Sequence, residues 1–231
     1  MTDQTNTPAD ETRDDHLAPI RAQLLKAALA HVPFDGWSES TLKRAAQDTD
    51  IDEGLAELAF PSVLALVEFF IGDADCHMME ALGAMDLSSM KVRERIRTAV
   101  KTRLEVVAPH KEAEARAVHY MGLPWNAPTA LKHAWNTADL MWRAAGDTST
   151  DYNYYTKRLI LSGVYTSTLL VWLQDHSEDS QETWAFLDRR IDDVMQFEKI
   201  KSRVLGKRED RPSLLRALSR LRYGDRGRMK P

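Results

Sequence analysis

Apolar residues recur along this chain at the three- to four-residue spacing of amphipathic helices. Prolines and glycines separate these helical segments, and no stretch alternates between apolar and polar residues as a half-buried strand would. The pattern predicts helices at about 20–31, 38–47, 52–59, 61–85, 88–108, 110–121, 129–145, 151–175, 180–204 and 211–223. The predicted fold class is therefore all-α, with about nine helices followed by a C-terminal amphipathic helix.

Residues that favour a helix start stand where three of these helices should begin. Ser38 and Asp52 each have an oxygen that can accept a hydrogen bond from the first turn of the following helix. Pro61 suits the first position of the fourth helix, where no backbone N–H is needed.

The segment Leu159–Gln174 reads LILSGVYTSTLLVWLQ and contains no charged residue. It is shorter than the roughly 18 apolar residues that a membrane-spanning helix needs. The pattern predicts a central helix that is buried on all sides. A helix that lines an internal apolar cavity would have the same sequence, so the pattern does not separate a filled core from a cavity.

The net charge of −4 is unevenly distributed. Residues 1–19 carry −4, residues 20–206 carry −6 and residues 207–231 carry +6. We expect 1–19 to be a disordered acidic leader, because it has too little apolar surface to offset its ordering entropy. It also lacks the features of a targeting signal, so we expect a cytoplasmic bacterial protein or a processed organellar one. The single cysteine excludes an internal disulfide framework.

The sequence contains none of the common catalytic motifs. No histidine has a glutamate three residues before it, as a di-iron helical bundle requires, and there is no His-Glu-x-x-His, Gly-x-Ser-x-Gly or glycine-rich phosphate loop. We therefore expect no catalytic residue, no metal site and no cofactor.

The stretch 20–70 resembles the N-terminal helix-turn-helix module of the TetR regulator family in its helix order, its Gly36-Trp37 turn and its Phe60-Pro61 step. In that family the third helix enters the DNA major groove. Here the segment 52–59 reads DEGLAELA, with three acids and no base. Because basic groups drive DNA affinity, this composition disfavours binding to nucleic acid. A TetR-type ligand-responsive transcriptional regulator is nevertheless the alternative function.

Aromatic residues crowd the start of the helix predicted at 151–175, in the sequence AGDTSTDYNYYTKR. Aromatic and arginine side chains on an exposed surface are typical of protein–protein hot spots, although they can equally pack into the core. Together with the LPWN turn and the segment TLLVWLQDHSEDSQETWAFLDRRIDDVM, this stretch resembles the coenzyme Q (ubiquinone) biosynthesis accessory protein family over about residues 20–200.

The resemblance implies a TetR-like homodimer that binds an isoprenoid quinone precursor or another lipid. It also implies that the protein helps the demethoxyubiquinone hydroxylase to reach its membrane-bound substrate, without being an enzyme itself. Residues 20–70 would then be a degenerate helix-turn-helix part, and 71–206 the part for lipid binding and dimerisation.

The family's partner-binding patch falls on four positions of this chain. They are Asp151, Tyr154, Tyr155 and Arg158. Members of the family commonly have tryptophan where this chain has Tyr154. The candidate lipid-contacting residues are apolar positions of the predicted helices. They are Trp125, Leu140, Met141, Leu169 and Trp172.

The basic tail 207–231 contains a short amphipathic helix at 212–223. Its apolar face consists of Leu214, Leu215, Leu218 and Leu221. Arg216 and Arg220 lie on the opposite, cationic face, which is the pattern of an interfacial membrane helix. We expect this helix to dock the protein on the inner membrane, on the cytoplasmic side in bacteria or the matrix side in mitochondria. Docking on its own domain or a partner, or binding to nucleic acid, are the alternatives.

Overall fold

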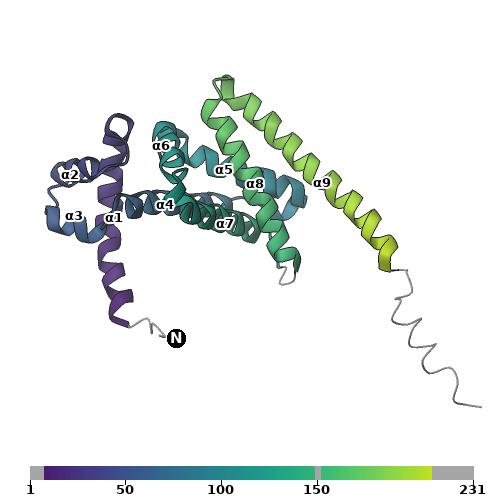
Figure 1. The fold of residues 1–231 in the computed structure, drawn as a ribbon, viewed down its shortest axis with the longest axis horizontal. Helices are drawn as coiled ribbons and strands as arrows, with labels where there is room; N and C mark the ends of the chain where they lie inside the picture. Colours follow the sequence, from purple (N-terminus) through teal and green to yellow (C-terminus); the bar gives the residue numbers. More distant parts are fainter. Residues whose placement is uncertain (1–7, 149–151, 210–231) are drawn as a thin grey trace, which may run out of the picture. The chain divides into compact units, whose positions relative to one another are not determined.

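The computed structural model describes residues 8–148 and 152–209. These residues form nine α-helices and no β-strand (Figure 1), which confirms the all-α prediction. The helices are α1 Pro8–Asp35, α2 Glu39–Asp48, α3 Glu53–Ala59, α4 Val63–Gly83, α5 Val92–Val107, α6 Lys111–Met121, α7 Ala127–Ala144, α8 Tyr152–Gln174 and α9 Gln181–Glu209. Short 3-10 turns lie at Leu87–Ser89, Ala108–His110, Pro124–Asn126 and Glu178–Ser180.

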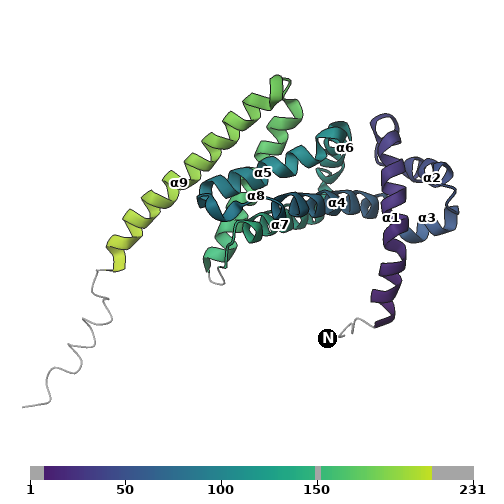
Figure 2. The same ribbon diagram turned by 180° about the vertical axis from the view of Figure 1, so that it is seen from behind.

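The chain divides into two compact units, Met1–Leu187 and Asp188–Pro231. The division falls inside α9, whereas the sequence suggested a boundary after residue 206. The first unit contains α1–α8 and the beginning of α9. In it α1, α2 and α3 group at one end, and α4 leads from them towards α5–α8 (Figures 1 and 2).

Helix α1 begins at Pro8, well inside the segment 1–19 that we expected to be a disordered leader. The physical reason lies in the first turns of the helix. Proline fits the first helical position because its missing N–H is not needed there. Residues 1–7 lie outside the described part of the chain.

The starts of α2 and α3 are those that the sequence predicted. The Thr41 backbone N–H donates to Ser38 Oγ at 3.2 Å, and the Leu55 N–H donates to Asp52 Oδ1 at 3.2 Å. The start of α4 differs, because Ser62 is the capping residue and Val63 the first helical one. Ser62 Oγ accepts from the Ala65 N–H at 3.1 Å, which leaves Pro61 before the cap.

Trp37 fixes the α1–α3 group to the rest of the first unit. Gly36 before it has a φ of +68°, which a glycine adopts without strain and which lets the chain turn sharply after α1. The Trp37 indole N–H donates to the Ala113 carbonyl in α6 at 3.1 Å. Its ring packs 5.1 Å from that of Phe70 in α4. The Gly-Trp turn therefore ties the first two helices to two helices of the bundle.

Helix α8 is not buried on all sides, contrary to the first of our two interpretations. Leu161, Val164 and Thr168 are buried, but Leu159 is 66% exposed and Leu170 is 52% exposed. The segment Leu159–Gln174 contains no charged residue, so its exposed face could not be recognised from polarity. Only the neighbouring helices decide which side is covered, and α7 is the one that α8 contacts most extensively.

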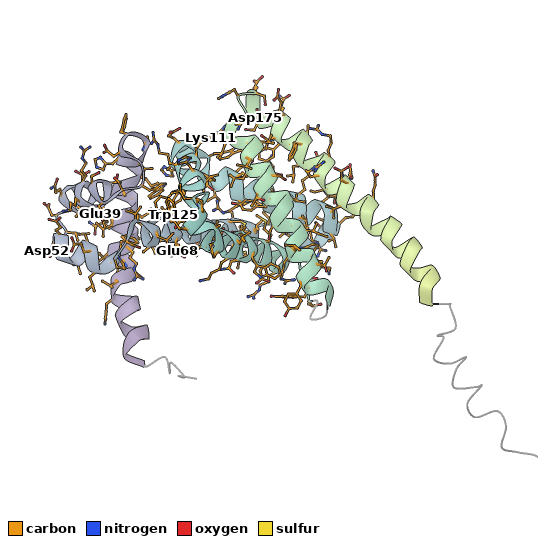
Figure 3. The ribbon with its side chains drawn as sticks, viewed as in Figure 1. Glu39, Asp52, Glu68, Lys111, Trp125 and Asp175 are labelled. Carbon is orange, nitrogen blue, oxygen red and sulfur yellow. The ribbon has the colours of Figure 1, made fainter. Side chains whose placement is uncertain are left out.

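Asp175 organises the turn that follows α8. It accepts hydrogen bonds from the backbone N–H and hydroxyl of Ser177 and from the same two groups of Thr183. Burial raises the pKa of Asp175, but these four hydrogen bonds outweigh that effect and hold the pKa well below its usual range. Lys111 also donates to the Asp175 carbonyl at 2.9 Å, and Figure 3 labels both residues. The turn is therefore fixed to α6 and to the start of α9.

Candidate functional site

A pocket of about 220 Å³ lies between α4, α5, α6, α7 and α8 in the first unit. Its wall is largely apolar. The lining residues are Ile71, Arg103, Glu114, Ala117, Val118, Met121, Gly122, Ala130, His133, Ala134, Thr137, Tyr165, Thr166, Leu169 and Leu170.

The burial of the lining residues distinguishes a deep end from an open end. Arg103, Glu114 and Thr137 are each at most 3% exposed and mark the deep end. Gly122 and Leu170 are exposed and mark the open end. An apolar chain can therefore enter from solvent at the open end, and the buried polar groups lie at the deep end.

The deep end contains a buried ion pair. Arg103 Nε on α5 donates to Asp75 Oδ1 on α4 at 2.7 Å, and both side chains are almost completely buried. Thr137 on α7 donates to the second oxygen of Asp75 at 2.8 Å. Burial lowers the pKa of Arg103, but Tyr165, Glu114 and Asp75 together raise it further, so the guanidinium remains charged.

Three polar atoms beside this pair have no hydrogen-bond partner. They are the two terminal nitrogens of Arg103 and one carboxyl oxygen of Glu114, Oε2. Burial raises the pKa of Glu114, and the nearby Arg103 opposes that rise only in part. The deep end therefore has hydrogen-bonding capacity that the protein itself leaves unused.

A histidine–carboxylate contact lies at the pocket wall. His133 Nε2 on α7 lies 3.0 Å from Glu68 Oε1 on α4, and Glu68 is labelled in Figure 3. His133 is one of the lining residues. This contact joins the two helices that flank the pocket.

Among the five residues that we predicted to contact lipid, only Leu169 lines this pocket. Met141 and Trp172 are buried in the core without reaching it, and Leu140 is half-buried. Trp125 is 73% exposed on the turn between α6 and α7 (Figure 3). Apolarity alone selected these positions, and it does not distinguish a residue at a cavity wall from one in a filled core or on the surface.

The predicted partner-binding patch contains a partly exposed aromatic group, in which Tyr155 is the exposed member. The Tyr154 and Tyr155 rings pack edge to face with centroids 5.1 Å apart, and Trp135 of α7 lies 6.1 Å from Tyr155. Tyr155 is 63% exposed, and Leu159, one turn further along α8, continues the apolar surface. The structure thus brings Tyr154 and Tyr155 together with Trp135, which the sequence analysis did not select. Asp151 lies outside the described residues.

Arg158 has a different position from the one we expected, because its side chain is only 2% exposed. It pairs with Asp139 through Nε and with Asp147 through Nη1 at 3.2 Å. Its guanidinium also stacks 3.4 Å from the centroid of the Tyr154 ring. The buried Arg158 therefore holds the Tyr154 ring in position and does not itself form part of the surface.

The membrane-contact residues of the predicted tail helix cannot be located, since 210–231 lie outside the described residues. Within the described part, no single helix is long and apolar enough to cross a membrane. The pair α3 and α4 satisfies that test only when taken together, and it is bent by 64°. The same part of the chain contains no group of three or more histidine, cysteine or acidic residues that could hold a metal ion.

The helix that would read DNA in a TetR regulator is acidic on its surface. Glu53 and Glu57 are exposed on α3, and Glu53 is paired with Lys43 of α2 at 2.7 Å. Figure 3 places Glu39 and Asp52 at the same end of the unit. Lys43, one of the few bases nearby, is thus already engaged by a carboxylate.

The arrangement of helices is similar to that of a solved TetR transcriptional regulator from Nitrosomonas europaea. The TM-score is 0.63, and the match covers 75% of this chain and 96% of that one. The sequence identity is 19%, so the similarity concerns the fold. It confirms the TetR-like fold that the first 70 residues predicted.

The family model for COQ9 matches residues 127–198, which contain α7, α8 and the partly exposed aromatic group. The protein named "Ubiquinone biosynthesis protein COQ9, mitochondrial" of Rattus norvegicus is 34% identical over 203 residues, covering 84% of this chain and 64% of its own length. That of Homo sapiens is 32% identical, covering 76% of this chain and 58% of its own.

The chain thus spans less than two thirds of the rat and human proteins. The COQ9-B protein of Xenopus laevis is 33% identical, and the match covers 84% of this chain and 68% of that protein. These similarities confirm the resemblance that the aromatic segment and the LPWN turn suggested. On this similarity along most of its length, the chain belongs to the COQ9 family.

Proposed function

We propose that this chain is a non-catalytic lipid-binding protein of ubiquinone biosynthesis. It takes up isoprenoid quinone precursors at the membrane and presents them to the demethoxyubiquinone hydroxylase. The pathway is supported by the names of the relatives, which are ubiquinone biosynthesis proteins. Lipid binding is supported above all by the largely apolar pocket of about 220 Å³ that opens to solvent at Gly122 and Leu170.

Binding would be driven by removal of the apolar tail from water, which contributes roughly 25 cal/mol for each Å² buried. The pocket is too small to enclose a long isoprenoid chain, since a cavity of about 150 Å³ holds a single benzene. Part of the ligand must therefore extend through the open end. Exposed apolar residues on α8, among them Leu170, would cover that part.

Presentation to the hydroxylase would use the partly exposed aromatic group of Trp135, Tyr154 and Tyr155. Aromatic side chains anchor protein interfaces because they bury a large area at a small entropic cost. The same helix, α8, carries Tyr155 near its beginning and the pocket residues Tyr165 and Leu169 further along. Docking at one end of α8 would bring the hydroxylase close to the lipid site.

The proposal includes a homodimer that docks on the inner membrane through the tail leucines, on the matrix side in mitochondria or the cytoplasmic side in bacteria. The relatives' names place those proteins in mitochondria. The +6 charge of residues 207–231 would attract anionic lipids by about 1 kcal/mol for each basic residue near the surface.

Native mass spectrometry of the purified chain tests lipid binding and oligomeric state together. We expect a dimer that carries a co-purified isoprenoid lipid and that converts no quinone precursor by itself. A lipid-free protein that also fails to bind an added decyl-chain ligand would refute the lipid-binding function.

The partner contact is tested by co-purification with the hydroxylase. Tyr155→Ala should reduce recovery of the hydroxylase several-fold while lipid occupancy stays unchanged, because Tyr155 is exposed and outside the pocket. Leu131→Ala is a matched control, since Leu131 is an exposed apolar residue of α7. Equal recovery with Tyr155→Ala and the wild type would remove this residue from the interface.

A further inference from the structure

The deep end of the pocket presents hydrogen-bonding atoms to an otherwise apolar space. Both terminal nitrogens of Arg103 and Oε2 of Glu114 are buried and have no partner. Buried polar groups in folded proteins nearly always have a partner, because leaving one unpaired costs free energy. Both residues line the pocket, so these atoms are placed to meet a bound molecule.

The position of Arg103 is fixed before any ligand arrives. Its Nε is held by Asp75 at 2.7 Å, and Asp75 is held in turn by Thr137. The guanidinium carbon lies 6.0 Å from the centroid of the Tyr165 ring. The two terminal nitrogens therefore remain as oriented donors, with an aromatic face next to them.

The charges of Asp75, Arg103 and Glu114, which together form a polar cluster, favour a neutral ligand group. Asp75 already compensates the positive charge of Arg103, and burial favours the neutral form of Glu114. An anionic ligand group would add a second negative charge beside Asp75, with only Arg103 to balance both. A carbonyl, methoxy or hydroxyl oxygen would accept from Arg103 without adding a charge.

We propose that the deep end binds the oxygen-bearing ring of the lipid, a benzoquinone or phenol, with ring oxygens accepting from the terminal nitrogens of Arg103 and interacting with Glu114. This inference rests on the proposed function and names the ligand group that the pocket recognises. The volume of about 220 Å³ suits one substituted ring, while the apolar tail leaves through the open end. Transfer to the hydroxylase then requires the ring to be released from Arg103.

A competition experiment separates this inference from lipid binding in general. The full chain is incubated with equimolar 2-decyl-1,4-benzoquinone and decylbenzene, which share a tail but differ in ring oxygens, and occupancy is measured by native mass spectrometry. We expect about tenfold preference for the quinone, the effect of one well-formed hydrogen bond. Equal occupancy would overturn the inference but keep lipid binding, and would mean that water satisfies the cluster. Occupancy by neither ligand would refute the proposed function itself.

A variant tests whether Arg103 supplies the preference. Arg103→Met is combined with Asp75→Asn, so that no unpaired carboxylate is left in the core. This double variant should bind decylbenzene as the wild type does but prefer the quinone by less than twofold. Lys101→Met, on the same helix but with a partly exposed side chain, is the control and should keep the preference. Retention of the preference in the double variant, or its loss in the control, would overturn the assignment to Arg103.

Discussion

Two arginines share Asp139 as a partner, yet they differ in what their removal should cost. Arg158 is 2% exposed and pairs with Asp139 and Asp147, whereas Arg143 is 64% exposed and pairs with Asp139 alone. Breaking a buried ion pair leaves an uncompensated charge in a low-dielectric environment, but an exposed pair is screened by water. The difference between these two positions lies in burial, since both have a carboxylate within ion-pairing distance.

Arg158→Met should therefore lower the free energy of unfolding by about 3 kcal/mol, the lower end of the range for a broken buried pair. Asp139 and Asp147 would each lose their buried partner and keep only Arg143 and Lys157, respectively. Arg143→Met should lower it by less than about 1 kcal/mol. Urea unfolding followed by tryptophan fluorescence measures both values. If the two variants were equally stable, Arg158 would not hold this part of the structure together.

At the scale of elements, α8 joins the two candidate functional regions of the first unit. Its first turns carry the exposed Tyr155, and Tyr165 and Leu169 line the pocket. One helix thus contributes to an exposed surface and to a cavity wall, and its sequence alone did not separate the two. The helix predicted at 212–223 is simpler to interpret, because the spacing of its leucines and arginines alone predicts two separate faces.

Leu214→Glu combined with Leu218→Glu should abolish sedimentation of the chain with anionic liposomes. Each leucine contributes roughly 1.5–3 kcal/mol when fully buried, so replacing two with carboxylates removes much of the attraction and adds repulsion. Ser213→Ala with Ser219→Ala changes only the polar face and should sediment as the wild type does. Circular dichroism checks that the other helices are retained. Unaltered sedimentation of the leucine variant would count against the tail as the membrane contact.

At the scale of the whole molecule, a regulator-like fold carries an acidic helix near its N-terminal end. The fold is similar to that of a TetR regulator, and α3 presents Glu53 and Glu57 to solvent, so we expect this surface to disfavour DNA. Binding to a duplex releases counterions only when basic groups displace them. At this helix, the similarity of fold to a regulator therefore does not by itself indicate the function of a regulator.

In a mobility-shift titration at low salt, the chain should form no sequence-specific complex with duplex DNA. Glu53→Lys with Glu57→Lys reverses the charge of α3 and should increase non-specific binding, which for basic surfaces has dissociation constants of about 10⁻⁴ to 10⁻⁶ M. A tight, sequence-dependent complex of the wild type would favour a ligand-responsive regulator instead.

The sequence by itself determined the order of the helices and several of their ends. Local interactions account for this success: the Ser38 and Asp52 caps form within one turn, and Gly36 permits the turn after α1. Where a local rule failed, another local contact took its place, as when Ser62 rather than Pro61 began α4. The aromatic segment at the start of α8 was also visible in the sequence, and so was the family to which it belongs.

Only the tertiary structure decided which side chains form the pocket and which form its polar end. Asp75, Arg103 and Glu114 come from three different helices, and each lies among buried apolar neighbours of its own helix. A charged residue on an apolar face was the signal that could have drawn attention to them. Their pairing depends on how α4, α5 and α6 pack, and helical periodicity says nothing about which faces meet. For the same reason Arg158, chosen from sequence as a surface contact, proved to be buried between two carboxylates.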